Sequence, residues 1–315
     1  MVSLRRKSSP THSGPVTGEP LGDAAIPAWF SSSLEQRPEH RHVTVDNSRV
    51  HLRAWGDRRN PPLVLLHGGG AHSGWWDHMA PYFAATHYVI APDLSGHGDS
   101  DRRPTYTLAL WAREALAVAN DADPSARPTL VGHSMGGWVA ATAATLFGNS
   151  LNGIVIVDSP LREDSPEERL LRSLKPVGRP YGSREEIVGR FRLVPSQQVV
   201  LPYIASHIAG ESVRRDIDGW RWKFDSTIFT GGALTVAPTD ESTLEHIMER
   251  MACRMAYLRC EHGSVPADMA DRIRAFLELR GPFVEIAHAG HHPMLDQPMA
   301  LVATVRTLLE FWSIT

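Results

Sequence analysis

Short apolar runs alternate with segments of helical pattern along most of the chain, and this alternation restricts the fold more than any other feature of the sequence. The runs are continuous, as expected of strands that are buried on both faces of a sheet. After an antiparallel pair at 43–45 and 50–55, they lie at 63–67, 88–93, 129–133, 153–158, 255–260 and 282–287. Helical pattern occupies 105–122, 136–147, 266–279 and 297–312. Strand and helix in alternation predict an α/β fold, with a mostly parallel sheet of about eight strands and helices on both faces.

One long interval departs from this alternation. Residues 159–251 contain no buried-strand signal and run from charged, helix-like stretches (SPEERLLRSL, SREEIVGRF) to a segment rich in Trp and Phe. An insertion of this size after the sixth strand predicts a helical cap over the carboxyl edge of the sheet, where open α/β sheets bind ligands. The core then comprises 27–158 and 252–315. Residues 1–26, rich in Ser, Pro, Gly and Thr and without the apolar stretch of a signal peptide, are expected to form a disordered tail.

The composition excludes several classes of protein. Among 315 residues, 32 Lys and Arg oppose 35 Asp and Glu, and the net charge of −3 creates no field that would attract nucleic acid. No apolar run approaches the ~18 to 20 residues of a membrane-spanning helix, so no membrane partner is expected. The two cysteines, Cys253 and Cys260, are too few for a disulfide framework or a zinc quartet. We therefore expect a soluble, cytoplasmic protein that acts on a small molecule, with its oligomeric state left open.

The segment Gly132-His133-Ser134-Met135-Gly136 has the pattern G-x-S-x-G. It follows a short apolar strand and opens a helix of small residues, which is the strand–turn–helix setting of a nucleophile elbow. Glycines at 132 and 136 allow backbone segments to approach closely, and the turn brings the serine hydroxyl to the sheet edge at a helix N-terminus. Ser134 is therefore the predicted nucleophile.

A serine hydroxyl needs a base at neutral pH. The candidate follows the last strand, in Ala289-Gly290-His291-His292-Pro293. His291 comes directly after Gly290, in a loop that leads to the final helix, and is the predicted base, with His292 as its rival. His288, His291 and His292 also suggest a metal site, but no further cluster at ligand spacing accompanies them. We expect no metal and no cofactor.

The oxyanion that forms during acyl transfer needs backbone donors that are already in place. His67-Gly68-Gly69-Gly70 follows the third strand and supplies such a loop. The N–H of Met135, directly after the nucleophile, and the N–H of Gly69 or Gly70 form the predicted oxyanion hole. A dinucleotide-binding G-x-G-x-x-G would need glycine where Ser73 stands, so that interpretation fails.

Together these segments resemble the α/β-hydrolase superfamily, in its branch of capped serine esterases and C–C hydrolases. The matching segments are LLHGGG (65–70), DLSGHGDS (93–100), GHSMGG (132–137) and AGHHP (289–293). They come in the order and spacing of the family and cover the chain from about residue 41 to 315, apart from the cap. The resemblance implies an α/β-hydrolase core with the cap inserted after strand six. It also implies that Asp93 and Asp99, in the second segment, are structural.

The third member of the triad is where the sequence departs from this family. Relatives usually carry an aspartate after the seventh strand, in a G-x-x-D pattern, but this chain has Gly263 there. Asp158, at the end of the sixth strand, occupies a place that some family members use for the acid. Glu261, at the end of the seventh strand, is the alternative, and Asp268 is a further one. The acid accepts a hydrogen bond from the imidazole and fixes its tautomer, so we favour Asp158 and leave the alternatives open.

With serine as nucleophile, the resemblance implies a carboxylesterase that hydrolyses an ester, thioester or lactone through an acyl-enzyme on Ser134. Two alternatives stay open: cleavage of a carbon–carbon bond in a vinylogous diketone, and a small-molecule receptor that keeps the fold without turnover. An apolar substrate pocket is predicted from the aromatic residues Trp75, Trp76, Trp220 and Trp222, with Phe224 and Phe229. Arg214, Arg215 and Arg221 are cations that could bind a substrate carboxylate, but we favour the interpretation that these three lie on solvated cap surface.

Overall fold

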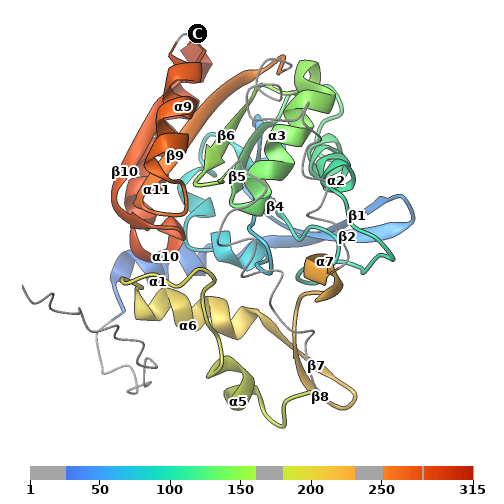
Figure 1. The fold of residues 1–315 in the computed structure, drawn as a ribbon. Coiled ribbons are helices and arrows are strands. Elements are labelled where there is room, and N and C mark those ends of the chain that lie inside the picture. Colours follow the sequence, from blue (N-terminus) through green and yellow to red (C-terminus); the bar gives the residue numbers. More distant parts are fainter. Residues whose placement is uncertain (1–25, 161–179, 231–250, 279, 315) are drawn as a thin grey trace, which may run out of the picture.

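The computed structural model describes residues 26–160, 180–230, 251–278 and 280–314 (Figure 1). The predicted tail, except for its last residue, and the SPEERLLRSL stretch of the predicted cap lie outside these residues.

The core is an eight-stranded sheet. In spatial order its strands are β1 (Glu39–Val45), β2 (Ser48–Trp55), β4 (Tyr88–Pro92), β3 (Pro62–Leu66), β5 (Thr129–His133), β6 (Gly153–Val157), β9 (Arg254–His262) and β10 (Phe283–Gly290). Only β2 runs against its neighbours, pairing antiparallel with β1 and with β4, and the other pairs are parallel. The predicted mostly parallel α/β sheet is confirmed.

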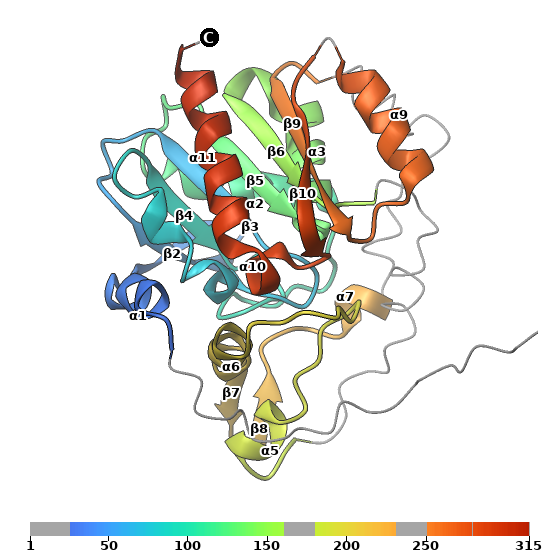
Figure 2. The ribbon, with the colours of Figure 1, turned by 90° about the vertical axis from the view of Figure 1, so that its left-hand side faces the viewer.

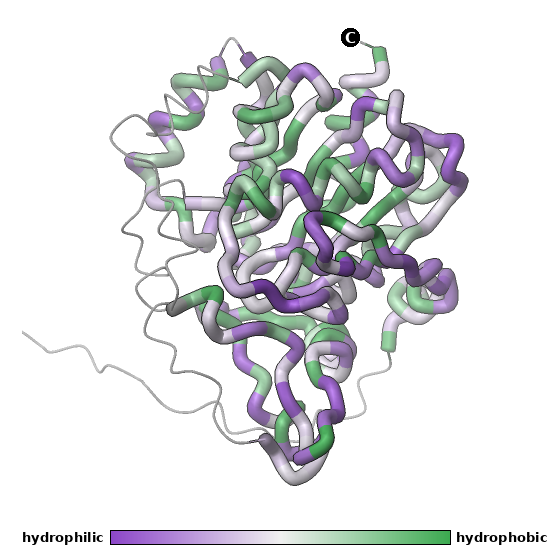
Figure 3. Tube along the Cα trace, turned by 90° about the vertical axis from the view of Figure 1, so that its right-hand side faces the viewer, coloured by the Kyte–Doolittle hydropathy of each residue, from purple (hydrophilic) through white to green (hydrophobic). Residues whose placement is uncertain are grey.

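The sheet separates two hydrophobic layers. Successive side chains of a strand point to opposite faces, so in β3 Val64 packs into one layer and Leu65 into the other. The first layer is closed by α2 (Leu108–Asn120), α3 (Met135–Phe147) and α9 (Ala267–Leu277). The second is closed by α1 (Ala28–Glu35), α10 (Pro293–Asp296) and α11 (Pro298–Ile314). Figure 2 shows α11 in front of the sheet and α3 behind it, and Figure 3 shows hydrophobic segments concentrated in the sheet and these helices.

The described residues between β6 and β9, which we call the cap, lie below the carboxyl edge of the sheet (Figure 1). The described elements of the cap are α5 (Arg184–Val188), α6 (Pro202–Glu211), α7 (Thr227–Thr230) and the antiparallel pair β7 (Val213–Asp216) and β8 (Gly219–Trp222). These elements follow β6, where the sequence predicts an inserted helical cap. The cap is not purely helical, however, because the hairpin β7–β8 lies within it. The hairpin escaped prediction because its strands are short and half-exposed, so they carry no continuous apolar run.

An ion-pair network attaches the cap to the core. The buried Arg53 on β2 donates through Nη1 to Asp77 at 2.5 Å and through Nη2 to Glu211 of α6 at 2.6 Å. His207, also on α6, lies 2.9 Å from the same oxygen of Asp77. These contacts fix the position of α6 against the sheet edge. None of the helices in the described part of the chain is long and apolar enough to cross a membrane.

Candidate active site

Ser134 lies in the sharp turn between β5 and α3, with φ of 53° and ψ of −120°. This conformation is sterically costly for a residue with a Cβ and persists only when its surroundings enforce it. Here Gly132 and Gly136 allow the close packing that holds Ser134 in this conformation. A Cβ on Gly132 would overlap the carbonyl of Gly136, and a Cβ on Gly136 would overlap the carbonyl of Leu66 in β3. The close contact between β5, α3 and β3 thus depends on both glycines.

The Ser134 hydroxyl is the end of a continuous hydrogen-bond chain. His291 Nε2 lies 3.1 Å from Ser134 Oγ, and His291 Nδ1 lies 2.8 Å from Asp158 Oδ2. A carboxylate only accepts hydrogen bonds, so Nδ1 carries the proton and Nε2 is free to accept from the serine. The three residues follow β5, β6 and β10, whose carboxyl ends meet at one edge of the sheet.

The carboxylate of Asp158 is fully buried and held from several directions. Its Oδ1 accepts from the N–H of Cys260 at 3.0 Å, and its Oδ2 from the N–H of Ser264 at 2.8 Å. Glu261, the alternative acid, points elsewhere: it is partly exposed and accepts from the N–H of His288 at 2.7 Å. Of the two carboxylates, the structure brings Asp158 to His291.

Gly263 explains why the usual acid position is empty. A Cβ built on Gly263 would overlap the carboxylate of Asp158. The side chain that reaches over from β6 therefore occupies the space that an aspartate at 263 would need. The third candidate, Asp268, lies in the first turn of α9.

His292, the rival base, is buried beside Trp75, and within the described chain neither of its ring nitrogens is hydrogen-bonded. Burial and the neighbouring His291 lower the pKa of His292 well below its usual range, so its ring is neutral. The same burial lowers the pKa of His133, whose Nε2 lies 2.7 Å from the carbonyl oxygen of His291. This bond ties the histidine loop to the nucleophile elbow.

Two groups of histidines bear on the metal question. Nitrogens of His133, His291 and His292 lie within 4.8 Å of one another, whereas His288 belongs to a separate group with Glu261 and His262. His288, which the sequence places near His291 and His292, therefore does not join these two residues in one group. A metal at the first group would compete with Ser134 for the Nε2 lone pair of His291, so that group cannot hold a resident metal and serve a serine at once.

The loop after β3 lies against the elbow. Gly69 and Gly70 line a cavity beside the ring of Phe229, and Met135 opens α3 directly after the serine. The first N–H groups of a helix have no partner within it, so the Met135 N–H is available to an oxyanion. Both ring nitrogens of His67 are hydrogen-bonded to backbone groups: Nδ1 lies 2.8 Å from the carbonyl of Gly68, and Nε2 accepts from the N–H of Leu94.

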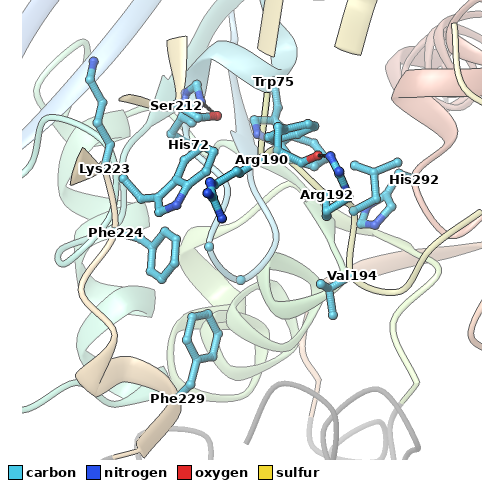
Figure 4. A pocket seen from close by; sticks show the side chains of 15 residues that line it. His72, Trp75, Arg190, Arg192, Val194, Ser212, Lys223, Phe224, Phe229 and His292 are labelled. Atoms are coloured by element: carbon cyan, nitrogen blue, oxygen red, sulfur yellow. Dashed lines mark hydrogen bonds between the residues drawn. The ribbon is translucent and has the colours of Figure 1, made fainter. Parts of the chain in front are cut away.

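The cavity between cap and core has a volume of about 240 Å³ (Figure 4). Of the aromatic residues predicted to line it, Trp75, Trp222, Phe224 and Phe229 do so. Trp76 is instead buried in the second hydrophobic layer, and Trp220 pairs with Tyr181 on the outer part of the cap. The two cap tryptophans differ in position along β8: Trp222 pairs with Val213 at the end next to α6, whereas Trp220 pairs with Arg215 near the turn.

Three cations that the sequence did not point to also line the cavity: Arg190, Arg192 and Lys223. The three arginines considered from sequence, Arg214, Arg215 and Arg221, lie on the hairpin and are not among the described lining residues. The path of the cap loop after α5 decides which cations face the cavity, and no motif in the sequence encodes that path.

Two buried polar residues behind the site were also missed. His72 lines the cavity, accepts from the N–H of Gly74 and therefore donates through Nε2 to Ser212 at 2.9 Å. Burial lowers its pKa to about 4, so it is neutral. Asp296 accepts from the N–H of Gly290 at 2.6 Å and so fixes the start of the histidine loop; burial raises its pKa to about 6.

Comparison with known proteins identifies related sequences and structures. The family model described as the alpha/beta hydrolase family matches residues 63–305. An uncharacterized protein of Mycobacterium tuberculosis is 33% identical over 186 residues, which are 57% of this chain and 51% of that protein. The chain thus spans about half the length of this relative.

Two further proteins match over most of the chain. An esterase of Mycobacterium tuberculosis is 27% identical over 283 residues, covering 84% of this chain and 88% of the esterase. A thioesterase domain from the curacin biosynthetic pathway has a similar structure, with a TM-score of 0.70 at 20% identity, covering 85% of this chain and 99% of that domain. At this identity the likeness to the solved structure concerns the fold alone.

Proposed function

Because the chain belongs to the alpha/beta hydrolase family, we propose that it is a serine hydrolase that cleaves a carboxylic ester, thioester or lactone through an acyl-enzyme on Ser134. The observation that carries the proposal is the chain of hydrogen bonds from Asp158 through His291 to the Ser134 hydroxyl. The esterase of Mycobacterium tuberculosis, which matches most of the chain, lends further support.

In the proposed reaction, Ser134 Oγ attacks the carbonyl carbon while its proton passes to His291 Nε2. The negative oxygen of the tetrahedral intermediate is stabilised by the N–H groups of Met135 and of Gly69 or Gly70. The bond to the leaving group then breaks, and the imidazolium gives its proton to that group. Water, deprotonated by His291, hydrolyses the acyl-enzyme and restores the serine.

Asp158 completes this assignment as the acid. It keeps the proton on Nδ1 and stabilises the imidazolium that forms when Nε2 accepts the serine proton. The receptor alternative rested on the missing acid after strand seven, and a buried carboxylate bonded to His291 removes that reason for it.

Hydrolysis of p-nitrophenyl acetate and butyrate tests the proposal. We expect turnover by the wild type and a loss of about 10⁴-fold or more in Ser134→Ala, since the nucleophile is gone. Ser32→Ala, which changes an exposed serine of α1, is the matched control and keeps full activity. Equal activity of wild type and Ser134→Ala would contradict the proposal.

A further inference from the structure

The cavity that Gly69, Gly70 and His292 help to line, without Ser134 among its described lining residues, combines an apolar wall with an excess of positive charge. Trp75, Phe191, Leu193, Trp222, Phe224 and Phe229 supply the wall. Arg190, Arg192 and Lys223 supply the charge, and no Asp or Glu is found among the described residues that line the cavity. Figure 4 shows Arg190 and Arg192 near the centre of the lining, with Lys223 at its left edge.

The three cations differ in how far they are neutralised. Lys223 Nζ lies 2.7 Å from Asp99 Oδ2, and Arg190 has Glu186 at 3.6 Å and stacks over the ring of Tyr181. Arg192 has no such counter-charge in the described part of the chain, where its hydrogen bonds go to the backbone carbonyls of Gly189 and Phe191. Three cations against two carboxylates leave about one positive charge unbalanced, and it is centred on Arg192.

Arg190 and Arg192 are exposed, with 62% of the Arg190 side chain accessible, so solvent screens their charge in part. Apolar walls of low dielectric focus the field of the cations into the cavity. A guanidinium also matches the planar, paired oxygens of a carboxylate or phosphate, to which it donates two parallel hydrogen bonds. The other polar lining residues, His72, Ser212 and His292, carry no negative charge, because both histidines are neutral and His72 is bonded to Ser212.

From this arrangement we propose that the cavity selects esters with an apolar body and an anionic end, carboxylate or phosphate, which Arg192 binds with the help of Arg190. The proposal rests on the serine hydrolase function and names the substrate class of that site. The apolar body lies against the aromatic wall, and the anionic end lies toward the loop after α5. The scissile carbonyl then meets the glycine loop, since Gly69 and Gly70 line the same cavity.

Two p-nitrophenyl esters with acyl chains of equal length test the charge preference. One is the pentanoate, and the other is the monoester of glutarate, which differs by a terminal carboxylate. After subtraction of the rates without enzyme, we expect kcat/KM of the wild type to favour the glutarate ester by about tenfold. We expect this ratio to fall toward one in Arg192→Gln, to fall less in Arg190→Gln, and to shrink with added salt.

Arg215→Gln is the matched control, because Arg215 is an exposed arginine of the neighbouring hairpin and does not line the cavity. It keeps both the wild-type activity and the wild-type ratio. A wild-type ratio at or below one, or a ratio that Arg192→Gln and Arg190→Gln leave unchanged, overturns the proposal.

A binding measurement separates this proposal from the hydrolase function and distinguishes the two anions. Calorimetric titration of Ser134→Ala with glutarate, with butyl phosphate and with the neutral pentanamide requires no turnover. Tighter binding of glutarate assigns a carboxylate, and tighter binding of butyl phosphate assigns a phosphate, provided that Arg192→Gln weakens it. Binding of both anions no tighter than that of pentanamide overturns the proposal even if ester hydrolysis is observed.

Discussion

At the scale of single residues, the burial of Asp158 governs how the site works. Its carboxylate accepts from the N–H of Cys260 in β9, from the N–H of Ser264 in the loop after it, and from the imidazole of His291. Backbone donors fix the position of the carboxylate whether or not the histidine is charged. The carboxylate of Asp158 therefore has a fixed position, from which it orients the ring of His291.

Asp158→Asn tests this role. The amide can donate to Nδ1 and so favours the tautomer in which Nε2 carries the proton and no longer accepts from the serine. We expect kcat for a p-nitrophenyl ester to fall by about 10³ to 10⁴, with the circular dichroism spectrum unchanged. Glu261→Gln is the control and should change kcat far less, because Glu261 is bonded to the backbone of His288. The reverse ranking of the two variants would contradict the assignment.

The sequence narrowed the acid to a few residues but could not select one. Asp158 and Glu261 follow neighbouring parallel strands, so both reach the same sheet edge. What separates them is side-chain direction, which depends on the positive φ of 46° at Asp158 and on the space left free at Gly263. Gly263 was a usable signal for Asp158 as the acid. Because position 263, after β9, carries no side chain, the carboxylate of Asp158 from the end of β6 has room there.

At the scale of elements, the nucleophile elbow is held by backbone packed against backbone. The start of α3 lies against the carboxyl end of β3 so closely that Gly136 has no room for a side chain. Ser134 keeps its strained conformation because these two elements cannot separate without losing the core around them.

Gly136→Ala is expected to destabilise the protein by about 1–3 kcal/mol, since the new methyl group overlaps the carbonyl of Leu66 and forces the two elements apart. The same shift displaces Ser134, so specific activity falls as well. Urea unfolding gives the first quantity and ester hydrolysis the second. The control is Gly182→Ala, where the nearest atom to the added Cβ is Glu186 Oε2 at 3.6 Å. Equal stability of the two variants would show that the elbow tolerates a side chain.

Strands that are buried on both faces of the sheet were predicted from the sequence, whereas strands with an exposed face were missed wholly or in part. Strands such as β5 and β6 are buried throughout, so their residues form continuous apolar runs. The hairpin in the cap is half-exposed, and its signals were Asp218-Gly219 at the turn and the tight spacing of the two strands. The first part of β1, EHRH, was missed for the same reason, because this edge strand is largely exposed.

At the scale of the whole molecule, buried neutral histidines couple stability to pH. Burial lowers the pKa of His72 and His78 to about 4 and that of His97 to about 3, and it also lowers the pKa of His133 and His292 well below the usual range. In the unfolded chain these groups titrate near pH 6.5. Between pH 6.5 and about 4 the unfolded state therefore binds more protons than the folded state.

The free energy of unfolding should consequently fall as the pH is lowered from 6.5 toward 4. Each buried histidine contributes up to about 1.4 kcal/mol per pH unit to this slope. His78→Gln, which keeps a donor for the carbonyl of Met294, should reduce the slope by about that amount in urea unfolding between pH 6 and 5. His262→Gln, at an exposed position, should leave the slope unchanged. An identical slope in wild type and His78→Gln would contradict the account.

The central claim, that Ser134 is an activated nucleophile, is tested most directly by a fluorophosphonate probe, whose phosphorus forms a covalent bond to a reactive serine. Intact mass after labelling, followed by peptide mapping, gives the number and place of the adducts. The account predicts one adduct, on the peptide that contains Ser134, which is absent from Ser134→Ala and forms more slowly in Asp158→Asn. A folded wild type that takes up no probe, or an adduct that persists in Ser134→Ala, would contradict it.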